Sequence, residues 1–204
     1  MKKSLLLSLT CLASCAFAQK SFFGVDAGIN VANQRIATSP NPSFTFSYLW
    51  TGTFFLKNVV KPTFGIFYQH RFSDLIAIRV QGSYMGLGYK SQGSFGSDVS
   101  IDYLTFPVSI QYSANKHLSF GAGPYLSFTL GGTKINNEDI TKTYHKNDFG
   151  FFMGGEHDLY KNFALGVKYF IGTKNIWLND QNGTLKYTNR ALQFTLIYKF
   201  KKTI

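Results

Sequence analysis

Apolar and polar residues alternate with a period of two along most of the chain that follows residue 20. In residues 22–31, Phe23, Val25 and Ile29 fall on one side of an extended segment, and small or polar residues fall on the other. The pattern recurs in residues 76–84, 104–112, 118–130, 163–172 and 191–200, and more weakly in residues 63–72 and 148–157. Because such alternation is the signature of a β-strand with one apolar face, the sequence predicts eight strands.

The predicted strands have the length and composition of membrane strands. Each spans about 10–13 residues, whereas a typical strand has about 5–6 and a membrane-crossing strand about 9–11. The face opposite the apolar one is rich in Gly, Ser, Thr and Gln and carries only single charges. A sheet face in contact with water normally carries more Lys and Glu. The segments therefore favour a barrel with an apolar outer face over a soluble sandwich.

The predicted connections alternate in length. Residues 73–74, 114–116 and 158–162 form short connections, and residues 33–62, 90–100, 132–147 and 173–187 form long ones. Short periplasmic turns and long extracellular loops are typical of outer-membrane barrels. The sequence therefore predicts an all-β fold, an eight-stranded antiparallel up-and-down transmembrane β-barrel. Its chain is expected to enter and leave on the short-turn side.

Aromatic residues are abundant, at 17% of the chain. They concentrate near both ends of the predicted strands, as expected for rings that favour the headgroup level of a bilayer. The short-turn ends carry Phe23, Phe72, Tyr112, Phe163, Tyr198 and Phe200. The long-loop ends carry Tyr84, Tyr89, Tyr103, Phe149 and Phe151. The alternative, an aromatic-rich soluble core, leaves the alternation of loop lengths unexplained.

The first residues have the pattern of an export signal. Lys2 and Lys3 precede an apolar stretch, and residues 16–18 read Ala-Phe-Ala, which fits a cleavage site. We expect residues 1–18 to be a signal peptide and residues 19–204 to be the outer-membrane barrel domain. The alternative is lipidation of Cys15, because residues 12–15 also resemble a bacterial lipobox.

Composition and charge exclude several classes of protein. Charged residues are 15% of the 204 residues, against roughly 25% in soluble domains, and no apolar run is long enough for a helical membrane span. Two cysteines exclude a disulfide-rich scaffold. The formal net charge of +11 favours contact with anionic lipid headgroups over nucleic acid in an exported protein.

No pattern of catalytic, metal-binding or cofactor-binding residues is found. His70, His117, His145 and His157 lack metal-ligand spacing, and the chain has no nucleophile elbow or phosphate-binding loop. Residues 117–119, His-Leu-Ser, faintly resemble the motif of a barrel lipid A deacylase, but they fall at a predicted periplasmic turn. We therefore expect no enzyme activity, no metal and no cofactor, and keep a lipid-modifying enzyme as an alternative.

The inward face of the predicted barrel carries a polar network. Its members are Asp26, Arg79, Gln81, Glu156 and Lys168. Asp26 and Arg79 lie at similar distances from the short-turn ends of their strands, so they could share a level. Because isolated buried charges are costly, we expect the charges to pair across the lumen. An eight-stranded barrel is only wide enough for side chains or one small ligand, which favours a plugged interior over a conduction path.

The longest predicted loop carries six aromatic residues that are candidates for contact with a partner. They are Phe44, Phe46, Tyr48, Trp50, Phe54 and Phe55. The long loops also carry more Lys and Arg than Asp and Glu, so lipopolysaccharide phosphates are candidate ligands. A structured cap with no partner, and loops that are merely solvated, remain the alternatives.

Six short motifs occur in order along the chain. They are residues 24–30 (GVDAGIN), 103–108 (YLTFPV), 123–126 (GPYL), 148–150 (DFG), 168–176 (KYFIGTKNI) and 189–193 (NRALQ). With these motifs the chain resembles the PorT-like outer-membrane β-barrel protein family of Gram-negative bacteria. The resemblance implies an outer-membrane location and no shared activity, although some relatives are linked to protein secretion. The end departs from the barrel pattern, because four residues follow the aromatic Phe200.

These expectations converge on an integral outer-membrane barrel with a structural or interaction role, whose outer loops contact lipid, lipopolysaccharide or a protein partner. The first alternative is a narrow pore, or an accessory component of protein secretion or transport across the outer membrane. A soluble periplasmic barrel anchored through Cys15 is a further alternative.

Overall fold

The computed structural model describes residues 21–38, 56–91, 98–131, 134–135, 138–139, 145–176 and 185–200. These residues form eight long strands: β1 (Ser21–Thr38), β3 (Val59–Arg71), β4 (Ile76–Ser91), β5 (Asp98–Ser113), β6 (Leu118–Thr129), β9 (Asn147–Tyr160), β10 (Phe163–Gly172) and β11 (Leu185–Phe200). Three short strands accompany them: β2 (Leu56–Lys57), β7 (Lys134–Ile135) and β8 (Glu138–Asp139). No helix in the described part of the chain is long and apolar enough to cross a membrane.

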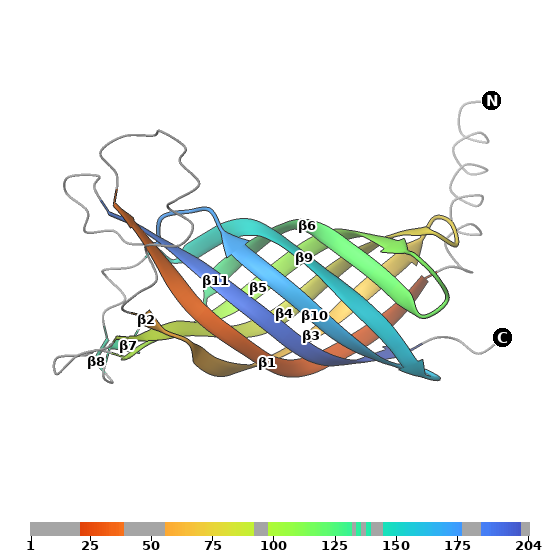
Figure 1. Ribbon diagram of the computed structural model, residues 1–204, viewed down its shortest axis with the longest axis horizontal. Helices are drawn as coiled ribbons and strands as arrows, with labels where there is room; N and C mark the ends of the chain where they lie inside the picture. Colours follow the sequence, from red (N-terminus) through yellow and green to blue (C-terminus); the bar gives the residue numbers. More distant parts are fainter. Residues whose placement is uncertain are drawn as a thin grey trace, which may run out of the picture.

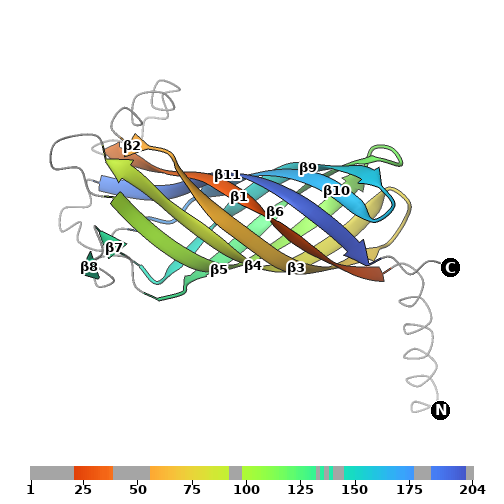
Figure 2. The same cartoon turned by 90° about the horizontal axis from the view of Figure 1, so that it is seen from below.

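The eight long strands close into an antiparallel barrel. Each pairs with its neighbours along the chain, and the first strand, β1, also pairs with the last, β11, where Ala27 lies opposite Leu196. The strands run obliquely to the long axis in both views (Figures 1 and 2). The start of β1 and the end of β11 lie at the same end as the β3–β4, β5–β6 and β9–β10 turns, on the right of Figure 1. We call this the short-turn end and the opposite one, which carries β2, β7 and β8, the long-loop end. The predicted fold is confirmed.

The alternating residues point in the directions that the pattern predicts. On β1, Phe23 is 64% exposed, whereas Asp26, three residues further along the strand, is only 4% exposed. On β5, Val108 and Ile110 face outward, whereas Ser109 is buried. Around the middle of these strands the barrel is therefore apolar outside and polar inside, the reverse of a soluble protein.

Side chains close two of the short turns. In the β3–β4 turn, the Oγ atom of Ser73 accepts hydrogen bonds from the backbone amides of Leu75 and Ile76. In the β5–β6 turn, the Oδ1 atom of Asn115 accepts hydrogen bonds of 2.8 Å from the amides of His117 and Leu118. Ser and Asn favour turns because their short side chains can replace backbone acceptors in this way.

Several strands continue beyond the segments predicted from alternation. β1 runs to Thr38 and pairs there with Leu185, and β4 and β5 extend to Ser91 and Asp98, in residues that the sequence pattern assigns to loops. The expected bounds of the long connections are corrected accordingly. Toward the long-loop end, polar residues such as Asn33 and Arg35 take outward positions, so the apolar alternation fades although the strand pairing continues.

Buried apolar residues form two clusters inside the barrel. A small one at the short-turn end holds Phe22, Phe67, Ala164 and Ile197. A larger one lies toward the long-loop end and includes Met85, Ile101, Tyr103, Phe152 and Phe170. Tyr103 is fully buried, and Tyr89 packs against this cluster. These two tyrosines belong to the interior and not to the predicted outer girdle, because their odd-numbered positions on β5 and β4 face inward there.

Candidate functional site

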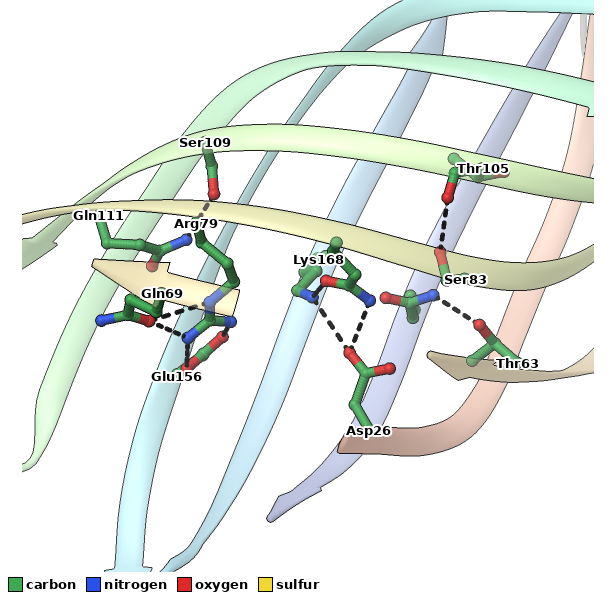
Figure 3. A network of polar contacts seen from close by, with 12 residues as sticks. Asp26, Thr63, Gln69, Arg79, Ser83, Thr105, Ser109, Gln111, Glu156 and Lys168 are labelled. Carbon is green, nitrogen blue, oxygen red and sulfur yellow. Dashed lines mark hydrogen bonds and ion pairs between the residues drawn. The ribbon is translucent and has the colours of Figure 1, made fainter. Parts of the chain in front are cut away.

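One buried charged group in the barrel is built around Arg79 of β4. Its Nη2 atom donates hydrogen bonds to Oε1 of Gln69, at 2.7 Å, and to Oε2 of Glu156, at 2.9 Å. Nη1 forms a further ion pair with Glu156. The guanidinium also lies 4.2 Å from the centre of the Phe67 ring, a cation–π contact. Figure 3 shows Gln69, Arg79 and Glu156 pointing toward one another from different strands of the barrel wall.

Lys199 of β11 extends this group toward the short-turn end. Its Nζ atom lies 3.5 Å from Oε2 of Glu156 and pairs with Asp158. Glu156 therefore contacts two cations, each from a different strand, and its charge is compensated although the side chain is buried. Buried ion pairs persist only with such additional hydrogen bonds and partners.

A second charged group joins Asp26, Gln81 and Lys168 from β1, β4 and β10. Gln81 donates a 2.8 Å hydrogen bond from Nε2 to Asp26, and Lys168 donates a 3.0 Å hydrogen bond to Oε1 of Gln81. The Lys168 ammonium lies 3.4 Å from the Asp26 carboxylate. The three side chains thus tie together β1, β4 and β10, and Figure 3 shows Asp26 and Lys168 pointing toward each other.

Amide and hydroxyl side chains, together with the carboxylate of Asp148, fill the lumen between the charged groups and the long-loop end. Gln193 donates hydrogen bonds to Asn30, at 3.1 Å, and to Thr63, at 3.0 Å. Closer to the long-loop end, Asn189 donates to Asp148, at 2.9 Å. The polar layers therefore extend from the short-turn end to the buried apolar cluster.

Glycines on the inward face leave room for these long side chains. A Cβ atom added at Gly65 would lie 2.8 Å from Oδ1 of Asp26 and 2.9 Å from Nε2 of Gln81. One added at Gly24 would overlap the Phe67 ring, which supports Arg79. The glycine-rich polar face of the sequence therefore reflects space that the network occupies.

Little space is left among the charged side chains in the described part of the lumen. A hollow between Gln111, Glu156 and Lys168 has a volume of about 10 Å³, roughly the room that one water molecule needs. Together with the apolar cluster toward the long-loop end, this packing makes the lumen a filled interior.

All five residues of the predicted polar network lie buried in the lumen. Their pairing differs from the simplest expectation, because Asp26 and Arg79 do not pair with each other. Arg79 pairs with Glu156, and Asp26 pairs with Lys168. Through β3, the register places Asp26 in line with Ser83 and Arg79 in line with Phe22, so the two residues do not share a level.

Sequence reasoning omitted Gln69 and Lys199 from the network. Both occupy inward positions of their strands, so the alternation contained the signal that could have found them. The six candidate aromatics of the longest loop, Phe44, Phe46, Tyr48, Trp50, Phe54 and Phe55, lie outside the described residues, as do the expected signal peptide and Cys15.

The segment His-Leu-Ser of residues 117–119, which resembles a deacylase motif, lies at the β5–β6 turn and the start of β6. His117 lies exposed in the β5–β6 turn at the short-turn end, and Ser119 follows in β6. The described residues contain no group of three or more His, Cys, Asp or Glu side chains that could hold a metal ion.

Comparisons with known proteins point to one family. Over residues 4–200 the chain matches the family described as outer membrane protein beta-barrel domain, and no curated protein matches the chain significantly. Among solved structures, the barrel is similar to Neisserial surface protein A, with a TM-score of 0.53 and 13% identity, covering 87% of this chain and 97% of that one. It is also similar to outer membrane protein AlkL, solved in DMPC lipid bilayers, with a TM-score of 0.50 and 14% identity, covering 91% and 93%. At such identities the likeness shows a shared fold.

Proposed function

The chain belongs to the outer membrane protein beta-barrel domain family, and we propose on that basis that it is an integral barrel of the outer membrane with a structural or interaction role. In this role the barrel is an anchor whose long-loop end faces the outside of the cell. The finer assignment, to the PorT-like family, is supported by the six sequence motifs and their order.

The observation that carries the proposal is the inversion of the two faces. Large apolar side chains face outward around the barrel, with Ile66 at 69% exposed and Ile110 at 63% exposed, whereas Arg79, Glu156 and Lys168 are buried inside. An outer surface of this kind is stable in hydrocarbon and aggregates in water. The filled lumen supports a structural role over conduction.

Heat-dependent gel mobility tests the membrane placement. A closed barrel in lipid has no open strand edge, so its hydrogen bonds resist SDS until heating. We expect unheated protein from the outer-membrane fraction to migrate differently from boiled protein. Recovery of the protein in the soluble periplasm without a mobility shift would contradict the proposal and favour the soluble anchored barrel.

The proposed contact surface is the set of loops at the long-loop end. Lipid, lipopolysaccharide and a protein partner are the proposed contacts, supported by the aromatic and basic composition of the loops. Replacing the six aromatics of residues 44–55 with serine tests the partner contact. The proposal requires the heat shift to persist while crosslinks to a partner disappear, and unchanged crosslinks count against it.

Export is proposed to occur by the N-terminal signal peptide. The intact mass of the mature protein separates cleavage after Ala18 from lipidation at Cys15. The lipid-modifying alternative has its own readout, because an active enzyme changes the mass of lipid A in cells that carry the protein. The placement of His117 at the short-turn end favours a protein without that activity, since the proposal puts this end in the periplasm.

A further inference from the structure

Two exposed histidines lie next to each other at the short-turn end of the barrel. His117 is in the β5–β6 turn and His157 is on the outward side of β9, and their ring centres are 6.4 Å apart, with the ring planes tilted by 49°. The pairing of β6 with β9 brings the two together, because Leu118 lies opposite His157. The spacing of histidines along the sequence, which predicted no metal site, cannot reveal a pair that is formed across two strands.

The backbone holds these two residues in place. In the turn, the Oδ1 atom of Asn115 accepts hydrogen bonds of 2.8 Å from the amides of His117 and Leu118. The carbonyl oxygen of His117 accepts a 2.7 Å hydrogen bond from the amide of Asp158, the residue that follows His157. The turn and β9 are therefore joined directly beside the two rings, so a ligand that binds both rings meets a preorganised pair.

The ring nitrogens of the pair are open to a ligand. Within the described part of the chain, neither ring makes a hydrogen bond or an ion pair. Leu118 and Leu165, which lie opposite His157 on the two neighbouring strands, have no polar side-chain atoms. His70 differs, because its Nδ1 atom lies 2.8 Å from the Oγ atom of Ser21. A neutral imidazole keeps one nitrogen lone pair for a ligand, so the pair offers two.

The separation of the rings suits two ligands of one metal ion. With Zn–N bonds of about 2.0–2.1 Å, two imidazoles on one ion have ring centres roughly 5–6 Å apart. The observed 6.4 Å is slightly longer, and a small rotation of either exposed side chain closes the difference. Imidazole is a good ligand for Zn²⁺, Cu²⁺ and Ni²⁺, whereas Mg²⁺ and Ca²⁺ prefer oxygen ligands.

We propose that His117 and His157 together bind a divalent transition-metal ion, with water completing its coordination. The bound ion joins the β5–β6 turn to β9 at the end of the barrel that the proposed placement puts in the periplasm. The protein supplies two ligands, since the described residues contain no group of three or more His, Cys, Asp or Glu side chains that could hold a metal. This site goes beyond the proposed structural or interaction role, which does not use it.

Metal titration of the untagged mature barrel in tag-free phosphatidylcholine nanodiscs tests the inference. Isothermal titration calorimetry measures the binding of Zn²⁺, with Mg²⁺ as the comparison, and electron paramagnetic resonance of bound Cu²⁺ counts the coordinating ring nitrogens. The variants are His117→Gln, His157→Gln and the combination of the two. The matched control is His145→Gln, which removes a histidine at the long-loop end.

The wild-type barrel is expected to bind one Zn²⁺ ion and to show two ring nitrogens on Cu²⁺. Each single variant is expected to weaken Zn²⁺ binding by about a hundredfold or more, because the second ligand of a chelate binds at a high effective concentration. The Cu²⁺ spectrum of each single variant is expected to show one nitrogen, and His145→Gln is expected to behave as the wild type.

Four outcomes overturn the inference. Zn²⁺ binding of unchanged strength in the double variant would place the metal elsewhere, for example at the amino terminus. A loss confined to one of the two single variants would reduce the site to one surface histidine. Binding of Mg²⁺ as tight as that of Zn²⁺ would indicate general attraction of cations. A wild-type Cu²⁺ spectrum with one nitrogen would contradict the pair without any variant. The heat shift of the same samples keeps a failure of metal binding distinct from a failure of the barrel to fold.

Discussion

At the scale of single residues, the interior is held by charges whose partners come from distant parts of the chain. Glu156 on β9 compensates Arg79 on β4 and Lys199 on β11. The sequence pattern indicated which side chains face inward, because that depends only on the period of two. It could not indicate which of them meet, because pairing depends on strand tilt and register around the closed barrel. The Arg79–Glu156 pair illustrates this limit.

Substitution of Arg79 by methionine is expected to destabilise the barrel by about 3–5 kcal/mol, because Glu156 loses its principal partner in a buried site. Adding Glu156→Gln to Arg79→Met is expected to recover part of the loss, since Lys199 retains Asp158. Urea unfolding in lipid vesicles measures both changes, with the exposed turn variant Lys116→Met as the control. A double variant no more stable than Arg79→Met would contradict the assigned pairing.

At the scale of strands, the outward residues of each long strand differ in their distance from the middle of the apolar outer surface. On β5, Val108 lies near the middle of the apolar outward positions, whereas on β3 Val60 lies opposite Val31, close to where they end. Alternation predicted the middle of every long strand. It missed ends such as residues 33–38 of β1, because the outward residues Asn33 and Arg35 are polar and backbone pairing defines the strand there.

Lysine substitutions at the two depths are expected to differ in cost. Val108→Lys should destabilise the barrel by about 2–4 kcal/mol, because an ammonium group at the bilayer midplane is poorly solvated, and Val60→Lys by about 0–1 kcal/mol near the interface. Unfolding free energies in vesicles give the comparison. A barrel that folds in water would tolerate both lysine substitutions equally. Equally small losses of stability would therefore contradict the proposed membrane placement.

At the scale of the whole molecule, the side chains that fill the lumen determine whether ions can pass through the barrel. Charged pairs occupy the short-turn half, and the apolar cluster around Tyr103 and Phe152 occupies the other. The sequence predicted a narrow interior from the strand number. The apolar cluster was not foreseen, because Met85 and Leu87, although on the same inward side of β4 as Arg79, lie beyond residue 84, where the predicted alternating segment ends.

Planar bilayers that contain the purified barrel are expected to show no single-channel conductance, because ions would have to displace paired charges and an apolar layer. Arg79→Met should also be silent, since the apolar cluster remains in place. Discrete openings of the wild-type barrel, at a frequency that rises with protein concentration, would favour the alternative of a narrow pore.

The pairing of β1 with β11 has a consequence for biosynthesis. The first strand to leave the ribosome finds its final neighbour only when the last strand has been made, as the pairing of Ala27 with Leu196 shows. Until then the nascent sheet has two unpaired edges, which hydrocarbon does not tolerate and which in water invite association with other chains. The barrel can therefore close only after β11 has been made, and until then both edges of the nascent sheet are open to pairing with other chains.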